Sequence, residues 1–193
     1  MYNLNTGQWL NRPKEAWVKD DLIQIKTDPG TDFWQNTYYQ FVHTNASAYI
    51  FPMNEDHTFT VKTAFQYREL FDQCGVLLYL NEQNWAKVSI ERENETRGWL
   101  GSVVTNLGYS DWATVSISGK PVTRSYRLSR RGADFLFEQS DDGVHFDQMR
   151  IFHMHALPRT PLAGIYACSP KQSSFVAEFS EFVWEPCLWK PHA

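Results

Sequence analysis

The chain has 193 residues, the size of one large domain, and its net charge of −4 argues against nucleic acid or an anionic membrane as partner. Its composition, 42% hydrophobic and 21% charged, excludes disorder and a coiled coil. Aromatic residues make up 16% of the chain, which favours a β-rich core and a binding face built from flat side chains.

The chain shows no sign of a membrane span or of a structural zinc site. It contains no run of about 18 apolar residues, and its first ten residues lack the basic and apolar parts of a signal peptide. Three cysteines, Cys74, Cys168 and Cys187, lie far apart and form no C-x-x-C pair. We therefore expect a cytoplasmic protein with reduced thiols, no metal and no membrane partner.

Strand patterns fill most of the chain. Residues 85–91 alternate strictly, with Lys87, Ser89 and Glu91 on one side of the strand and apolar residues on the other. Turn residues at 94–98 and a new strand pattern after them predict a hairpin. The ranges predicted as strands are 17–18, 22–26, 58–65, 74–80, 85–91, 99–106, 113–117, 125–129, 134–140, 146–153, 164–169 and 175–184.

These strands recur about every 10 to 15 residues with turn residues between them, which is typical of an antiparallel sandwich or barrel. Only residues 63–71 have a pattern that fits a short helical turn. No Pro-, Gly- or Ser-rich linker separates the first forty residues from the rest. We predict a single all-β domain over residues 1–193.

The common motifs of nucleotide cofactors and serine hydrolases, G-x-x-x-x-G-K-[ST], G-x-G-x-x-G and G-x-S-x-G, are absent, so we expect no cofactor. The enzyme hypothesis that remains is catalysis by carboxylates. Glu91, Glu93 and Glu95 would line one face of a strand that stayed extended. A retaining glycosidase needs two carboxyl groups about 5 to 5.5 Å apart. The alternative is that Glu93 and Glu95 lie at the solvated tip of the hairpin.

Two histidines, His153 and His155, are predicted to lie on one face of a strand. Such a pair chelates zinc or nickel when a third ligand converges on it, and the sequence identifies no third ligand. Ordinary hydrogen-bonding histidines are the favoured interpretation. Recognition of sugar or carboxylate oxygens is the alternative.

Residues 105–112 end one strand, turn through a glycine and place Asp111 and Trp112 at the start of the next. A tryptophan beside a carboxylate suits a sugar, whose apolar face stacks on the ring while its hydroxyl groups form hydrogen bonds. The structural alternative is that Ser110 and Asp111 cap backbone amides and Trp112 closes the end of the sandwich. Residues 31–34, Thr-Asp-Phe-Trp, allow the same two interpretations.

Five motifs, taken in order, resemble one family. They are residues 31–34, residues 84–87 with Glu91, residues 103–106 with 109–112, residues 141–143 with Phe146, and residues 163–170. The chain resembles, over about residues 15–185, the uncharacterised family that includes the regulation-of-enolase protein. Because the fold of that family is similar to the concanavalin A-like lectins and glucanases, the resemblance implies a curved, two-sheet antiparallel jelly roll with a concave groove. It implies no established activity and no catalytic residues.

The resemblance and the strand alternation together nominate ligand-binding residues. They are Trp34, Lys87, Glu91, Thr105, Asp111, Trp112, Arg127, Glu138, His153, His155 and Tyr166. Arg127 and Glu138 are expected to form a partly buried pair between neighbouring strands. In the plain interpretation, Lys87 and Glu91 form a surface charge pair worth less than about 1 kcal/mol, and Tyr166 belongs to the core.

Three functions follow as hypotheses. The first is non-catalytic binding of a saccharide or small polar metabolite in the groove. The second is a glycan-active hydrolase that uses Glu91 and a second carboxylate, with Glu138 as the candidate. The third is a regulatory module, like the enolase regulator, that binds a protein partner through an exposed aromatic patch. A homodimer is a further alternative, because sheet edges of this fold pair readily.

Overall fold

The computed structural model describes residues 3–53, 56–119 and 121–191. Within them, a short 3-10 turn (Leu4–Thr6) precedes two seven-stranded sheets and a small hairpin. Sheet A contains, in spatial order, β1 (Gln8–Leu10), β6 (Ser47–Pro52), β15 (Leu162–Cys168), β8 (Gln73–Asn81), β9 (Asn84–Arg92), β10 (Arg97–Asn106) and β11 (Tyr109–Ser118). Sheet B contains β14 (Asp147–His153), β13 (Asp134–Ser140), β12 (Thr123–Arg131), β7 (His57–Phe65), β16 (Val176–Pro186), β3 (Leu22–Lys26) and β2 (Glu15–Lys19). The hairpin joins β4 (Phe33–Gln35) to β5 (Val42–Thr44).

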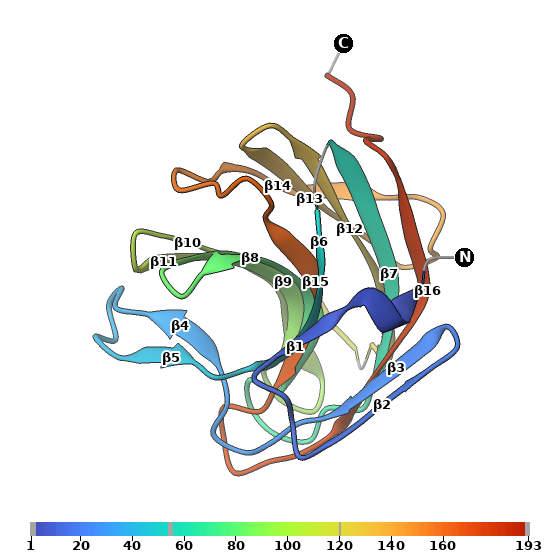
Figure 1. Cartoon of the computed structure of the whole chain (residues 1–193). Coiled ribbons are helices and arrows are strands. Elements are labelled where there is room, and N and C mark those ends of the chain that lie inside the picture. Colours follow the sequence, from blue (N-terminus) through green and yellow to red (C-terminus); the bar gives the residue numbers. More distant parts are fainter. Residues whose placement is uncertain (1–2, 54–55, 120, 192–193) are drawn as a thin grey trace.

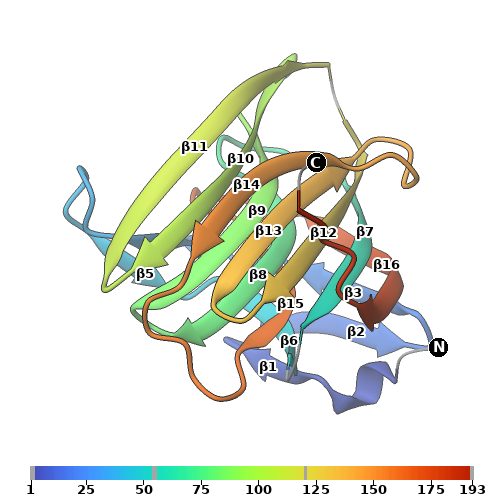
Figure 2. The same cartoon turned by 90° about the horizontal axis from the view of Figure 1, so that it is seen from above.

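The two large sheets lie face to face, and neighbouring strands within each sheet run antiparallel (Figures 1 and 2). The chain passes repeatedly between the sheets: β6 lies in sheet A, β7 in sheet B, β8 to β11 in sheet A and β12 to β14 in sheet B. This arrangement confirms the predicted all-β jelly-roll sandwich. Sheet A curves, and its concave face turns away from sheet B (Figure 1).

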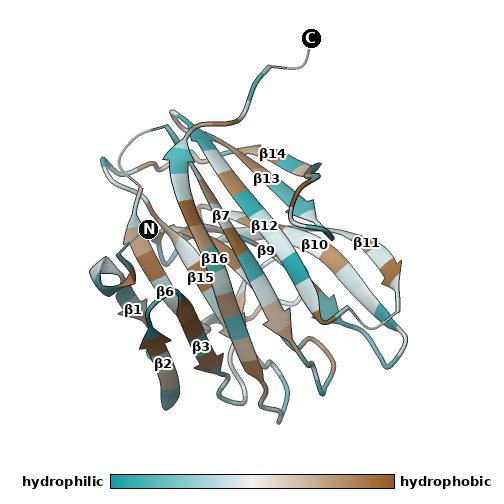
Figure 3. Cartoon of the chain, turned by 90° about the vertical axis from the view of Figure 1, so that its right-hand side faces the viewer, coloured by the Kyte–Doolittle hydropathy of each residue, from teal (hydrophilic) through white to brown (hydrophobic). Residues whose placement is uncertain are grey.

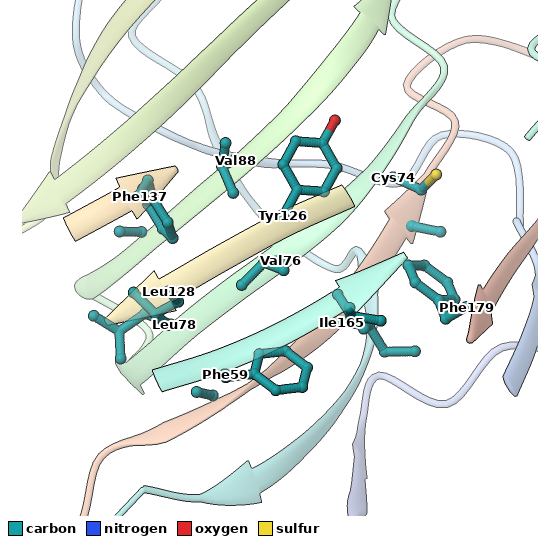
Figure 4. Packing of buried hydrophobic residues seen from close by; sticks show 14 of the residues in the cluster. Phe59, Cys74, Val76, Leu78, Val88, Tyr126, Leu128, Phe137, Ile165 and Phe179 are labelled. Carbon is teal, nitrogen blue, oxygen red and sulfur yellow. The ribbon is translucent and has the colours of Figure 1, made fainter. Parts of the chain in front are cut away.

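Strand alternation explains the core. Along β9, Ala86, Val88 and Ile90 point between the sheets, where apolar residues of sheet B meet them (Figure 4). Burying apolar area in this way supplies the main driving force for folding. Along β7, β12 and β16 of sheet B, hydrophilic and hydrophobic residues alternate (Figure 3). This alternation is expected of strands that have one face in the core and the other in contact with water.

The predicted strands are confirmed, with ends that shift by a few residues, and so is the hairpin of β9 and β10. The short helical turn that the pattern of residues 63–71 allows does not form, because β7 continues to Phe65 and a loop follows. Strands β1, β4, β5 and β6 were not predicted. Strand β6, second from the edge of sheet A, is buried on both faces over most of its length, so it has no polar alternation to reveal it.

Gly75 marks a place where two strands of sheet A approach closely. A Cβ atom at this position would collide with the backbone carbonyl of Val88 on β9. Backbone atoms at the centre of a sheet cannot move aside without breaking the ladder. We expect Gly75→Ala to lower the free energy of unfolding by about 3 kcal/mol, measured by urea denaturation. An unchanged denaturation midpoint would contradict this close approach.

The described residues contain no helix long and apolar enough to cross a membrane. All three cysteines are free, and Cys74 and Cys168 are buried. Burial raises the pKa of the Cys168 thiol well above its usual range, and Asp32 adds to the effect. These two thiols therefore stay protonated at neutral pH.

Candidate functional site

The β4–β5 hairpin packs on the concave face of sheet A, on the side opposite to sheet B (Figure 1). Phe33 and Trp34 of the hairpin join a second apolar cluster that includes Trp85 and Tyr166 of the sheet. Beside the hairpin lies a pocket of about 410 Å³. We call four of its polar residues, Asp32, Gln73, Lys87 and Glu91, the polar floor. We call Trp34, Tyr39, Phe41, Phe71 and Trp112, which also line it, the aromatic rim.

Lys87 is at the centre of the polar floor. The alternation of β9 turns it away from the core, yet its side chain is only 3% exposed. Its Nζ atom donates hydrogen bonds to Oδ1 of Asp32 at 3.2 Å and to Oε1 of Gln73 at 2.9 Å. Burial is the largest single influence on the pKa of Lys87 and would lower it, but Asp32, Cys168 and Glu91 together outweigh burial and raise it. Lys87 is therefore a charged ammonium with two assigned partners.

The loop before β4 holds Asp32 in position. The Asp32 backbone N–H donates to Oδ1 of Asn45, and its carbonyl accepts hydrogen bonds from the amides of Asn45 and Ala46. Oδ1 of Asp32 also accepts a hydrogen bond from the Phe33 amide at 2.7 Å. These contacts hold the Asp32 carboxylate in place independently of Lys87. The ion pair with Lys87 therefore requires little further loss of conformational freedom.

Glu91 lies two residues beyond Ser89 on the same face of β9, and its Cα partners are Gln73 on β8 and Trp99 on β10. It is 5% exposed, and its carboxylate accepts no hydrogen bond from the described residues; its oxygens are not among the fully enclosed atoms without a partner, so they face the pocket. Burial raises its pKa to about 7, with Lys87 lowering the pKa and Asp32 raising it. Glu91 therefore changes charge near neutral pH.

Gln73 connects the floor to the sheet beneath. Its Oε1 atom accepts hydrogen bonds from Lys87 and from the Tyr166 hydroxyl, the latter at 2.9 Å, and its Nε2 atom donates to the Phe71 carbonyl at 3.1 Å. The Tyr166 ring is fully buried, with the Lys87 ammonium 5.6 Å from its centroid. Tyr166 thus supports the floor from below, in agreement with the core interpretation.

The aromatic rim forms a connected wall. The Trp34 ring lies edge-on to Trp112, with centroids 6.4 Å apart, and edge-on to Tyr39 at 5.5 Å. Phe41 stacks on Tyr39 at 5.6 Å. Trp34 is fixed, because its Nε1 atom donates to the Thr37 carbonyl at 3.2 Å. Trp112 is 37% exposed, so part of its ring is open to a ligand.

Four of the residues predicted from sequence line this pocket: Trp34, Lys87, Glu91 and Trp112. Thr105 lies on β10 but does not line the pocket, because its hydroxyl lies 2.7 Å from that of buried Ser110. Asp111 does not line the pocket either. Side chains alternate along β11, so Trp112 points to the pocket and the adjacent Asp111 points to the opposite face. The Asp111 carbonyl instead accepts a hydrogen bond from Arg150 of β14.

The remaining predicted residues lie on or beside sheet B. Arg127 and Glu138 form the expected partly buried pair, with 3.6 Å between Nη1 and Oε2, but they belong to β12 and β13 and do not reach the pocket. His153 pairs with Asp134 at 2.7 Å, and its ring centroid lies 5.0 Å from that of His155. The described residues contain no cluster of three or more potential metal ligands.

The carboxylate row considered for Glu91, Glu93 and Glu95 does not form. Strand β9 ends at Arg92, and the Glu93 amide donates to the Arg97 carbonyl as the chain turns. Glu95 is exposed at the hairpin tip, as the alternative interpretation has it, whereas Glu93 is half-buried with its Oε2 atom enclosed. Of the three carboxylates, Glu91 alone lines the pocket.

Sequence reasoning missed Asp32 and Gln73 as members of the floor. The register of β8 against β9 would have revealed Gln73, because it lies opposite Glu91. Asp32 belongs to the segment 31–34 that the sequence had singled out, but its partner Lys87 is 55 residues away. No local pattern predicts that contact.

The fold and the pocket define a class: a β-sandwich of the lectin and glucanase type with a polar pocket on one concave sheet. The chain belongs to the family described as "Protein of unknown function (DUF1349)", which matches residues 9–187. It is 29% identical over 181 residues to Regulation of enolase protein 1 of Saccharomyces cerevisiae, covering 93% of this chain and 89% of that protein.

Two solved structures place the fold among known proteins. A functionally unknown protein from Saccharomyces cerevisiae superimposes with a TM-score of 0.90 and 26% identity, covering 97% of this chain and 100% of that chain. The GH43 BlXynB protein from Bacillus licheniformis gives a TM-score of 0.63 at 16% identity, covering 84% of this chain and 32% of that chain. The second likeness concerns the fold alone.

Proposed function

We propose that this protein binds a saccharide or a similarly small polar metabolite in the pocket of sheet A. One observation carries the proposal: a buried polar floor and an aromatic rim line the same cavity. Its volume of about 410 Å³ falls within the range of small-molecule sites. Trp34, Lys87, Glu91 and Trp112 are the proposed ligand-binding residues, together with Asp32.

The chemistry of the pocket suits a sugar. The apolar face of a sugar ring packs on an indole, and Trp112 offers a partly open ring. Hydroxyl groups both donate and accept hydrogen bonds, so one ligand can donate to the Glu91 carboxylate and accept from the Lys87 ammonium. Lys87 uses two of its three protons on Asp32 and Gln73, which leaves one for a ligand.

A ligand-detected NMR screen of oligosaccharides and sugar phosphates tests the proposal. We expect a hit whose affinity falls about tenfold in Trp112→Ala, the loss of one stacking contact. Trp17→Ala is the matched control, because Trp17 is 48% exposed on β2 of the other sheet. No hit from folded protein, or a hit that Trp112→Ala leaves unchanged, would overturn the proposal.

A glycan-active hydrolase is a second candidate. The observation that favours it is the raised pKa of Glu91, about 7, beside the ion-paired Asp32. Two carboxyl groups in unlike environments are the usual requirement for acid and base roles. Asp32 replaces Glu138 as the second carboxylate, since Glu138 lies on β13 of sheet B. Turnover of a screened glycan that persists in Glu91→Gln would exclude Glu91 as a catalytic carboxylate, and no turnover of any glycan would exclude the hydrolase function.

A regulatory interaction module is a third candidate. The loop between β4 and β5 exposes 86% of Tyr38 and 51% of Tyr39, and a yeast relative is named for regulation of enolase. Exposed aromatic residues that cluster on one loop are typical of protein contacts. Co-elution of this chain with purified enolase, retained in Glu91→Gln and lost in Tyr38→Ser, would favour this function over both others.

A further inference from the structure

The charges of the polar floor do not balance. It holds one ammonium, Lys87, and two carboxylates, Asp32 and Glu91. Lys87 is committed to Asp32, with Nζ and Oδ1 3.2 Å apart. The other basic groups at the pocket, His43 and Lys171, line its edge, where both are exposed to water. Glu91 is therefore the carboxylate without a matched positive charge.

Glu91 is also unsatisfied as a hydrogen-bond acceptor. It is 95% buried, it lines the pocket, and no described residue donates to it. A buried carboxylate without a donor destabilises the folded protein, and a group on a ligand can remove that penalty. A hydroxyl supplies a neutral donor, whereas an ammonium supplies a donor and the missing charge, which makes the stronger, charge-assisted hydrogen bond.

The aromatic rim points to the same chemistry. Indole and phenol rings attract ammonium groups over their faces, and tryptophan does so most strongly. The rim carries two tryptophans, Trp34 and Trp112, with centroids 6.4 Å apart. The protein already places one ammonium on this rim, since Nζ of Lys171 lies 5.7 Å from the centroid of Phe71. An anionic ligand would instead approach two carboxylates.

We propose that the pocket takes a saccharide bearing an ammonium group, an amino sugar, with the ammonium against the Glu91 carboxylate and the sugar ring against Trp112. The proposal rests on the function proposed above and specifies the ligand class. Repulsion between Lys87 and the ligand amine is offset, because the Lys87 charge is paired with that of Asp32 at 3.2 Å. Its remaining proton binds a hydroxyl of the same sugar.

The test compares two tetrasaccharides by titration calorimetry: the β-1,4-linked tetramer of glucosamine and cellotetraose, which carries a hydroxyl in place of each amine. We expect the glucosamine tetramer to bind about ten- to a hundredfold more tightly, as one charge-assisted hydrogen bond provides. Glu91→Gln should remove this preference. Glu95→Gln, which makes the same substitution at an exposed site outside the pocket, should preserve it.

The outcomes separate this inference from the proposed function. Equal or tighter binding of cellotetraose would overturn the inference and leave saccharide binding standing. A preference for the amine that survives in Glu91→Gln would also overturn it, because the attraction would then be that of the whole anionic protein. If neither tetramer binds, the inference fails, and the saccharide function fails with it when the oligosaccharide screen also gives no hit.

Discussion

Replacing Glu91 with glutamine is expected to stabilise the protein by about 3 kcal/mol at pH 8. Burial raises the pKa of this carboxyl from 4.5 to about 7, so the folded state holds its proton more tightly than the unfolded state does. For a carboxyl with a raised pKa, stability falls as the pH rises between the unfolded and folded values. A shift of about 2.5 units corresponds to about 3 kcal/mol. Glutamine has nearly the same shape as glutamate and carries no charge, so its burial has no cost of desolvating a carboxylate.

Urea denaturation of both proteins at pH 4 and pH 8 measures this effect. At pH 4 the carboxyl is protonated in the folded state and mostly protonated in the unfolded state, so the two proteins should be nearly equal in stability. At pH 8 the variant should be the more stable one. Glu95→Gln is the control and should match the native protein at both values, because Glu95 is exposed. A variant no more stable than the native protein at pH 8 would mean that Glu91 is solvated or has a donor.

Replacing Lys87 with methionine should lower the free energy of unfolding by about 2 to 3 kcal/mol at pH 8. Removing one partner of a buried ion pair leaves the other charge buried and unpaired. This lowers the free energy of unfolding by about 3 to 5 kcal/mol when both partners are fully buried. The loss here is smaller, since the Asp32 side chain is 20% exposed and water can reach it. Gln73 and Glu91 lose the same ammonium, and Glu91 then takes up a proton more readily.

The matched control is Lys26→Met. Lys26 pairs with Glu15 at 2.6 Å, but both side chains are about half exposed, so this pair contributes less than about 1 kcal/mol. Combining Lys87→Met with Glu91→Gln should give a smaller loss than Lys87→Met alone, because the second carboxylate is gone. Equal losses for Lys87→Met and Lys26→Met in urea denaturation would contradict a buried ammonium at the centre of the floor.

The sequence predicted most of the fold because strand alternation is a local signal. Along 85–91, the same pattern that placed Val88 in the core also placed Lys87 and Glu91 on the opposite face. The sequence left open how much of that face is exposed. The interpretation of Lys87 and Glu91 as a surface pair assumed an uncovered sheet, whereas both side chains are buried and Asp32, just before β4, contacts Lys87.

The rest of the site depends on contacts between distant segments. Asp32 reaches Lys87 only because the loop before β4 is tied to Asn45, and Tyr39 and Phe41 reach the pocket on that same hairpin. The sequence also could not assign strands to sheets. Arg127 and Glu138 have the alternation of a ligand-binding face, but β12 and β13 belong to sheet B.

A crystal structure of the protein soaked with the tightest-binding compound of the saccharide panel tests the central claim most directly. The account predicts the ligand in the pocket of sheet A, with a sugar ring on Trp112 and polar groups within hydrogen-bond distance of Glu91 and Lys87. A ligand bound elsewhere, with this pocket empty, would contradict the assignment of the polar floor and aromatic rim as the binding site.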